Sequence, residues 1–174
     1  MSKPNAERFA ILVIMGVSGC GKTTIAELLS RKLGWDYRDG DEFHPKANVE
    51  KMQSGTPLTD DDRWPWLKAI AAWIDERRSA GRPGIVTCSA LKRAYRDILI
   101  GGRDDVGLVY LKGDKELIAQ RLSQRKGHFM PKGLLDSQFQ TLQEPGPDER
   151  PITVSIAPSP EEIVAKVLAA LGKQ

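Results

Sequence analysis

The chain has 174 residues, of which 40% are hydrophobic, and this size suits a single domain with one core. Its 26 Lys and Arg residues nearly balance 23 Asp and Glu, giving a formal net charge of +3. Nucleic-acid-binding proteins usually carry a concentrated basic stripe, so we expect no nucleic-acid partner. The composition favours a small-molecule partner instead.

The sequence shows no sign of export or membrane insertion. Residues 1–8 lack the basic-then-apolar layout of a secretory signal, and the longest apolar run, 9–15, is only strand-length. Cys20 and Cys88 are the only cysteines, too few for a disulfide scaffold or a tetrahedral zinc site. We expect a cytoplasmic protein with reduced thiols and no membrane partner.

Strand-like and helix-like segments alternate along the chain, with Gly and Pro between them. This alternation predicts an α/β fold, with a parallel five-stranded sheet flanked by helices and ligands at the carboxyl ends of the strands. Strands are predicted at 9–15, 35–39, 84–88, 106–111 and 152–156, and helices at 22–33, 45–53, 60–80, 92–100, 114–125, 134–142 and 160–171.

A phosphate-binding loop follows the first predicted strand. The segment from Gly16 to Thr23 matches G-x-x-x-x-G-K-[ST] in full, between a strand and a helix, which favours this interpretation over an ordinary glycine-rich turn. Its backbone N–H groups and the helix start should hold ATP phosphates. Lys22 should reach the β- and γ-phosphates, and Thr23 offers a hydroxyl to Mg²⁺. The predicted nucleotide-binding residues here are Gly16, Val17, Ser18, Gly19, Cys20, Gly21, Lys22, Thr23 and Thr24.

Two aspartates follow the second predicted strand, so their carboxylates should face the phosphate loop. Gly40 between them permits a sharp turn. Phosphoryl transfer to an alcohol needs a group that orients the hydroxyl and accepts its proton, and it needs charge compensation around the metal. We assign Asp39 to the magnesium water shell or the base role and Asp41 to a substrate hydroxyl, although spacing alone does not separate them; a surface turn is the alternative. His44 either contacts the substrate or begins the next helix.

Basic residues are expected on the acceptor side of the cleft. Lys92 and Arg96 are predicted to share a helix face after the third strand, where an Arg and a Lys suit an anionic acceptor; a solvated face is the alternative. Arg63, within an acceptor-binding helical region at 42–80, is a further candidate. Arg121 and Arg125 lie four residues apart before a Gly- and Pro-bounded loop at 127–131, which we interpret as a lid that excludes water. Both arginines are expected to bind nucleotide, and Arg125 to stabilise charge during transfer.

Together these segments resemble the gluconate kinases, a branch of the P-loop small-molecule kinases related to shikimate and nucleoside monophosphate kinases. The resemblance implies transfer of the γ-phosphoryl group of ATP to the 6-hydroxyl of D-gluconate by a single domain, 1–174, with Mg²⁺, a lid and commonly a homodimer. The segments that carry it are 15–19, 39–45, 48–52, 55–67, 88–96, 110–113, 121–122, 125–130, 138–139 and 141–145.

Some points stay open at this stage. The acceptor could be shikimate or a nucleoside monophosphate, although the motifs around Asp41 and Lys92 argue against this. A nucleotide-binding regulatory module is a second alternative, but the sequence lacks the N-K-x-D base-recognition motif of GTPases. Cys20 stands where the family frequently has Ser, and Gln143 where it frequently has Glu. A thiol close to Lys22 at a helix start also suggests sensitivity to oxidants.

Overall fold

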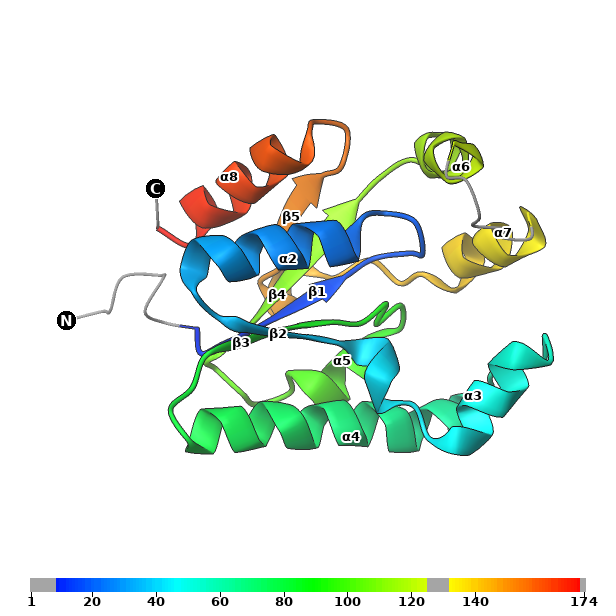
Figure 1. The fold of residues 1–174 in the computed structure, drawn as a ribbon, viewed down its shortest axis with the longest axis horizontal. Helices are drawn as coiled ribbons and strands as arrows, with labels where there is room; N and C mark the ends of the chain where they lie inside the picture. The colour runs from blue at the N-terminus through cyan, green and yellow to red at the C-terminus, as the bar shows by residue number, and fades with distance from the viewer. Residues whose placement is uncertain (1–8, 125–131, 173–174) are drawn as a thin grey trace.

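The computed structural model describes residues 9–124 and 132–172 (Figure 1). The predicted lid at 127–131 and the candidate catalytic residue Arg125 lie outside the described residues. None of the helices within the described ranges is long and apolar enough to cross a membrane.

The described residues form a five-stranded parallel sheet, as predicted, in the order β2-β3-β1-β4-β5. The central strand β1 pairs with β3 on one side, where Ile11 is opposite Gly84, and with β4 on the other, where Ile11 is opposite Val106. The strand order therefore switches sides at β1: β2 and β3 lie on one side of it, and β4 and β5 lie on the other. Open α/β sheets bind their ligands at such a switch point. The strands are β1 (Ile11–Met15), β2 (Asp36–Asp39), β3 (Gly84–Thr87), β4 (Val106–Lys112) and β5 (Ile152–Ser155).

Helices cover both faces of the sheet, which explains the continuous apolar run of β1. Because successive strand side chains point to opposite faces, Leu12 and Ile14 pack into the core beneath α2 (Lys22–Leu33) and α8 (Pro160–Ala170). Ile11, Val13 and Met15 pack into a second core, beneath α4 (Asp60–Ser79) and α5 (Arg93–Leu99). Figure 1 shows these two helical layers on either side of the sheet.

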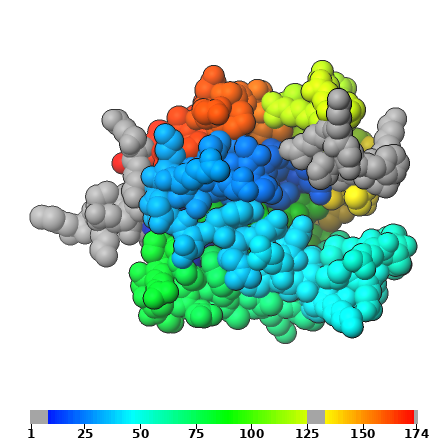
Figure 2. Space-filling view, viewed as in Figure 1, coloured from blue at the N-terminus to red at the C-terminus, as the bar shows by residue number. Residues whose placement is uncertain are grey.

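The remaining elements are the 3-10 helices η1 (Gly40–Phe43) and η2 (Pro147–Glu149) and the helices α3 (Lys46–Gln53), α6 (Lys115–Ser123) and α7 (Lys132–Thr141). Except for the short helix η2, which directly precedes the parallel strand β5 and so lies at its amino end, they surround the carboxyl ends of the strands. In the space-filling view, α3 protrudes at the end of the molecule that also carries α7 (Figure 2). Helix α4 begins at Asp60, as predicted, and Thr59 caps it. The Thr59 hydroxyl accepts from the Asp62 N–H, and the Thr59 N–H donates to the Asp62 carboxylate.

Candidate functional site

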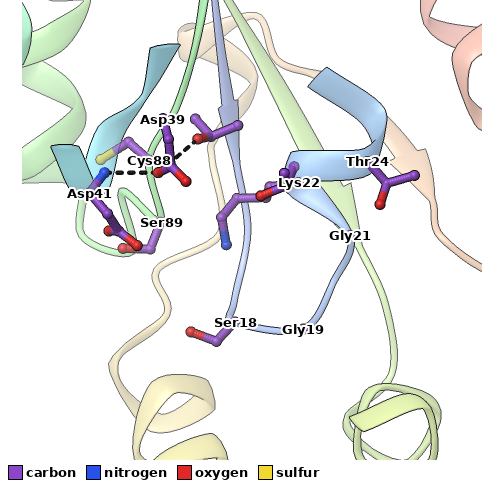
Figure 3. A pocket seen from close by; sticks show the side chains of 11 residues that line it. Ser18, Gly19, Gly21, Lys22, Thr24, Asp39, Asp41, Cys88 and Ser89 are labelled. Carbon is purple, nitrogen blue, oxygen red and sulfur yellow. Dashed lines mark hydrogen bonds between the residues drawn. The ribbon is translucent and has the colours of Figure 1, made fainter. Parts of the chain in front are cut away.

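One polar cavity of about 240 Å³ lies at the carboxyl ends of β1, β2 and β3 (Figure 3). It brings together the predicted phosphate loop and the predicted acidic pair, which come from separate parts of the sequence. Its lining residues are Ser18, Gly19, Gly21, Lys22, Thr23, Thr24, Asp39, Asp41, Thr87, Cys88 and Ser89.

The phosphate side of the cavity is built mainly from backbone. Helix α2 begins after Gly21, which has a left-handed φ of 95° and no side-chain cap. The first N–H groups of a helix have no partner within it, so they are available to phosphate oxygens at the positive end of the dipole. The Lys22 ammonium lies 2.9 Å from the Gly16 carbonyl oxygen and 3.2 Å from that of Val17. Figure 3 shows it pointing into the space between the loop and the aspartates.

Cys20 belongs to this loop but does not line the main cavity. Its side chain is only 3% exposed, and a Cβ on Gly16 would come within 2.6 Å of its sulfur. Oxidants react with accessible thiolates, so this burial argues against the predicted oxidant sensitivity. Cys88 does line the cavity, and burial raises its pKa to about 12, which keeps the thiol neutral.

The acidic pair is held by the edge of β3. One Asp39 carboxylate oxygen accepts from the Asp41 N–H at 2.9 Å and lies 3.5 Å from the Thr87 hydroxyl, so Asp39 caps η1. A Cβ on Gly40 would lie 2.0 Å from the Thr87 carbonyl oxygen. Glycine is therefore required here for close approach to β3. The Gly40 carbonyl accepts from the Trp66 indole N–H at 2.7 Å.

Asp41 is the freer of the two aspartates. Its side chain is 83% exposed and points into the cavity (Figure 3). Desolvation by the cavity walls, followed by repulsion from Asp39, raises the pKa of Asp41. A raised pKa makes a carboxylate a better proton acceptor. Water still reaches most of the side chain, so we expect it to be ionised at neutral pH.

His44 lies behind Asp41 and is not an open substrate contact. Its side chain is 4% exposed, and its ring stacks on Trp66 with centroids 4.2 Å apart. Its Nδ1 lies 3.2 Å from the amide nitrogen of Asn48, and its Nε2 lies 3.9 Å from the Asp41 carboxylate. Because an amide nitrogen only donates, Nδ1 accepts and Nε2 carries the proton. Burial lowers the pKa of His44, which favours this neutral form.

The basic residues of the acceptor side gather around Asp60, at the start of α4. The Lys92 ammonium lies 3.0 and 3.1 Å from the two Asp60 oxygens, and the Tyr95 hydroxyl also donates to Asp60. Arg63 lies 3.3 Å from the Tyr95 hydroxyl and 3.9 Å from Asp60. Hydrogen bonds from Tyr95 and Lys92 lower the pKa of Asp60. Arg63 and Lys92 are each 32% exposed, and the cluster keeps one net positive charge.

Arg96 is not part of this cluster, and its burial argues against the predicted role in binding the acceptor. Its side chain is 2% exposed, donates to both Glu149 oxygens at 2.7 and 3.2 Å and donates to the Ala90 carbonyl at 2.9 Å. Lys92 precedes α5 with an extended backbone, φ −104° and ψ 145°. The i, i+4 spacing therefore does not place Lys92 and Arg96 on one face.

A second cavity of about 360 Å³ adjoins the outer side of the phosphate loop. Arg121 from α6 lines it and donates to the Ala157 carbonyl oxygen at 3.3 Å. The sequence interpretation missed the segment after β5 that forms the opposite wall, although its Pro-Ser-Pro run signals a loop there. The lining residues are Gly19, Cys20, Gly21, Thr24, Ile25, Arg121, Ala157, Pro158, Ser159, Pro160 and Ile163.

Metal ligation by side chains alone has little support here. Within the described ranges, no three His, Cys, Asp or Glu side chains gather where they could hold a metal ion. Thr23 and Asp39 line the same polar cavity, so a cation there would depend largely on the oxygens of a bound phosphate.

Comparisons with known proteins agree with this geometry. Residues 11–145 match the family model described as an AAA domain. A gluconokinase of Gluconobacter oxydans (strain 621H) is 48% identical over 157 residues, which are 90% of this chain and 88% of that protein. The thermoresistant gluconokinase of Escherichia coli (strain K12) is 44% identical over 164 residues, which are 94% of each chain.

Comparison with solved structures also finds a gluconokinase among the similar proteins. A gluconokinase from Sinorhizobium meliloti 1021 has a TM-score of 0.84 and 44% identity, covering 95% of this chain and 93% of that one. A shikimate kinase from Aquifex aeolicus vf5 has a TM-score of 0.59 at 18% identity, covering 93% and 96%, a likeness that shows the shared fold alone.

Proposed function

Because this chain belongs to the gluconokinase family, we propose that it transfers the γ-phosphoryl group of ATP to the 6-hydroxyl of D-gluconate, giving 6-phospho-D-gluconate and ADP. One observation carries the proposal: a single cavity is lined by most of the phosphate loop and, facing it, by an exposed carboxylate of raised pKa. Phosphoryl transfer depends on positioning and electrostatic stabilisation, and this cavity supplies groups for both.

The charged side chains of the cavity, and His44 beside them, have proposed roles. Lys22 moves from its loop carbonyls to the β- and γ-phosphates, where it offsets charge that grows during transfer. Asp41 orients the acceptor hydroxyl and takes its proton, because it is exposed while Asp39 is engaged by Thr87 and by the Asp41 N–H. His44, with its proton on Nε2, supports Asp41 from behind.

The carboxylate of gluconate is proposed to bind at the cluster of Arg63, Lys92 and Tyr95. The cluster carries one net positive charge and is accessible, whereas the buried Arg96 is neutralised by Glu149. The gluconate carboxylate would interact with Arg63 and Lys92 alongside the Asp60 carboxylate. Neutral sugars of the same length lack this charge and should be poor acceptors.

The nucleotide is proposed to extend from the phosphate loop into the second cavity, where Arg121 and the segment from Ala157 to Pro160 would flank the base and ribose. Mg²⁺, held by Thr23, by water bound to Asp39 and by phosphate oxygens, would neutralise phosphate charge. A cytoplasmic location, a homodimer and a single domain over 1–174 remain proposals that rest on the sequence and the family resemblance.

The two alternatives have weaker support. A shikimate kinase shares the fold at 18% identity, which says nothing about the acceptor. A regulatory module that binds nucleotide without turnover would need no acceptor site. The groups around Asp41 and Lys92 would then have no substrate to bind.

The test is ADP release from purified protein with MgATP and one acceptor at a time: gluconate, glucose, shikimate, AMP or none. Glucose is the matched control, because it has the same carbon chain without the carboxylate. We expect release with gluconate alone and ³¹P NMR of the product to place the phosphate on C6. Stimulation by shikimate or AMP would overturn the acceptor, and bound ATP with no turnover would favour the regulatory module.

A further inference from the structure

A side chain from the second half of the chain fixes the phosphate loop. The Gln138 carbonyl oxygen on α7 accepts from the Ser18 backbone N–H at 2.7 Å, and the Gln138 amide nitrogen lies 2.9 Å from the Ser18 hydroxyl oxygen. The two residues are 120 positions apart. Ser18 lines the main cavity, whereas Gln138 does not, so Gln138 holds Ser18 from behind.

The chemistry of these two bonds determines the direction of the Ser18 proton. A backbone N–H can only donate, so the Gln138 oxygen must face it and the Gln138 NH₂ must face the Ser18 hydroxyl. An NH₂ group can only donate as well, so the hydroxyl accepts and its own hydrogen must point away from Gln138. Lys22 and Asp41 line the same cavity, so that hydrogen is available on the side where phosphate binds.

Packing and hydrogen bonds hold the segment around Gln138 in place. On the same helix, Leu135 is 5% exposed within the core, and Lys115 forms an ion pair with Asp136. Just after the helix, the Gln143 N–H donates to the Leu91 carbonyl oxygen at 2.7 Å, and the Gln143 side chain accepts from the Arg93 N–H at 2.9 Å. The segment that carries Gln138 is thus fixed to the acceptor side of the cleft.

The phosphate loop is also restrained from its other flank. A Cβ on Gly19 would lie 2.8 Å from side-chain carbons of Leu122 on α6. The loop is therefore packed between α6 and α7, with Leu122 against Gly19 and Gln138 on Ser18. A hydroxyl that is held in place before the reaction needs no reorganisation as charge develops.

We propose that the Ser18 hydroxyl donates a hydrogen bond to the phosphoryl group during transfer, and that Gln138 is the positioning residue that directs it. This inference rests on the proposed kinase function, and it assigns roles within that site. Ser18 would act on the transferring group itself, and Gln138 would act only through Ser18.

The test compares four variants with wild type: Ser18→Ala, Gln138→Glu, Gln138→Ala and the double Ser18→Ala/Gln138→Ala. Gln140→Glu is the matched control, because Gln140 lies on the exposed face of the same helix and acquires the same charge. The readouts are kcat with saturating MgATP and gluconate, and the Kd of MgADP by calorimetry. MgADP lacks the transferred phosphoryl group, so its Kd reports on the shape of the phosphate loop and not on a hydrogen bond from the Ser18 hydroxyl to that group.

We expect Ser18→Ala to lower kcat about tenfold, as expected for a lost hydrogen bond to a charged group, and to change the Kd of MgADP less than about threefold. Gln138→Glu should lower kcat by about the same factor, because a carboxylate only accepts and turns the Ser18 hydrogen toward itself. Gln140→Glu should keep kcat within about twofold. In the Ser18→Ala background, Gln138→Ala should have little further effect on kcat.

Several results would overturn the inference. These are a wild-type kcat in Gln138→Glu, independent multiplicative losses in the double variant, or equal losses of kcat and MgADP affinity. Should Gln138→Glu fail to fold, Ser18→Ala still decides, since it keeps the backbone bond to Gln138 and loses only the hydroxyl. If wild type turned over no acceptor, the proposed function would fail and the inference with it. An active wild type with fully active variants would overturn the inference alone.

Discussion

The two sides of the cleft differ in the groups that they offer to ligands: mainly backbone groups on one side and mainly side chains on the other. On the proposed nucleotide side, the binding groups are backbone N–H groups of the phosphate loop and the start of α2, with Lys22 as the main charged side chain. On the proposed acceptor side, they are side chains that already bind one another: Asp39 with Thr87 at the cavity, and Lys92 and Tyr95 with Asp60 at the start of α4. A backbone site depends on chain shape, whereas a side-chain site depends on which residues meet.

This difference predicts how substitutions will behave. Changes on the nucleotide side should alter catalysis with little effect on folding, because the α2 N–H groups and the Lys22 ammonium face a cavity. On the acceptor side, each substitution also removes a partner of another charged group. Effects on stability and on activity therefore have to be separated there.

The largest effect is expected from Lys22→Ala. Lys22 is proposed to supply a positive charge to the transferring group, so its loss should lower kcat about 10³-fold. In the free protein its ammonium contacts only the Gly16 and Val17 carbonyl oxygens among the hydrogen bonds described, so the melting temperature should change little. Steady-state kinetics and thermal unfolding would check both, with the exposed Lys68→Ala as the control. A kcat within tenfold of wild type would contradict the role of Lys22.

The next effect separates two cations of the α5 region. Arg96→Met leaves the mostly buried Glu149 carboxylate without its charged partner, so the free energy of unfolding should fall by about 3 kcal/mol. Lys92→Met removes a partly exposed ion pair, so stability should change by less than about 1 kcal/mol while the KM for gluconate rises. Urea unfolding and steady-state kinetics distinguish the two. A raised KM for gluconate in a stable Arg96→Met protein would restore the original prediction for Arg96.

A smaller effect concerns an ion pair away from the cleft. Hydrogen bonds from Arg103, with a further bond from Arg78, outweigh desolvation and lower the pKa of Asp75 to about 2. In the unfolded chain an aspartate titrates at about pH 3.9. A depressed folded pKa adds stability that is present above about pH 4 and lost as pH falls toward 2.

Asp75→Asn should therefore reduce stability at pH 7, and its difference from wild type should shrink between about pH 4 and pH 2. The effect is modest because the side chain is 45% exposed. Urea unfolding at several pH values gives the profile, and the exposed Asp104→Asn is the control. A difference that is constant with pH would show that the ion pair is not its source.

Much of the fold could be predicted from the sequence because its signals are local. Strand β1 is an unbroken apolar run because both of its faces are covered. The glycine-rich segment after it has the residue spacing of a phosphate loop, which few other structures share. All five predicted strands are present, with ends shifted by one or two residues. Such shifts are common, because strand ends depend on pairing with neighbours.

The acceptor side was harder to predict because its contacts are distant in sequence. Arg96 meets Glu149, 53 residues away, and no local pattern indicates that pair. His44 looked like a substrate contact, but Trp66 and Asn48 enclose it. Gln138, 120 residues from Ser18, shows the same limit on the nucleotide side. Spacing indicated which residues could carry chemistry, and tertiary packing decided which of them face the cleft.

The most direct test of the central claim, that the nucleotide and acceptor sides act separately in one cavity, is Asp41→Asn. The amide cannot accept the hydroxyl proton, so kcat/KM for gluconate should fall about 10²-fold or more. The Kd of MgADP should stay within about twofold, because the N–H groups that bind phosphate belong to another segment. Asp61→Asn, an exposed aspartate on α4, serves as the control. Equal losses of gluconate use and MgADP binding, or no loss at all, would contradict this account.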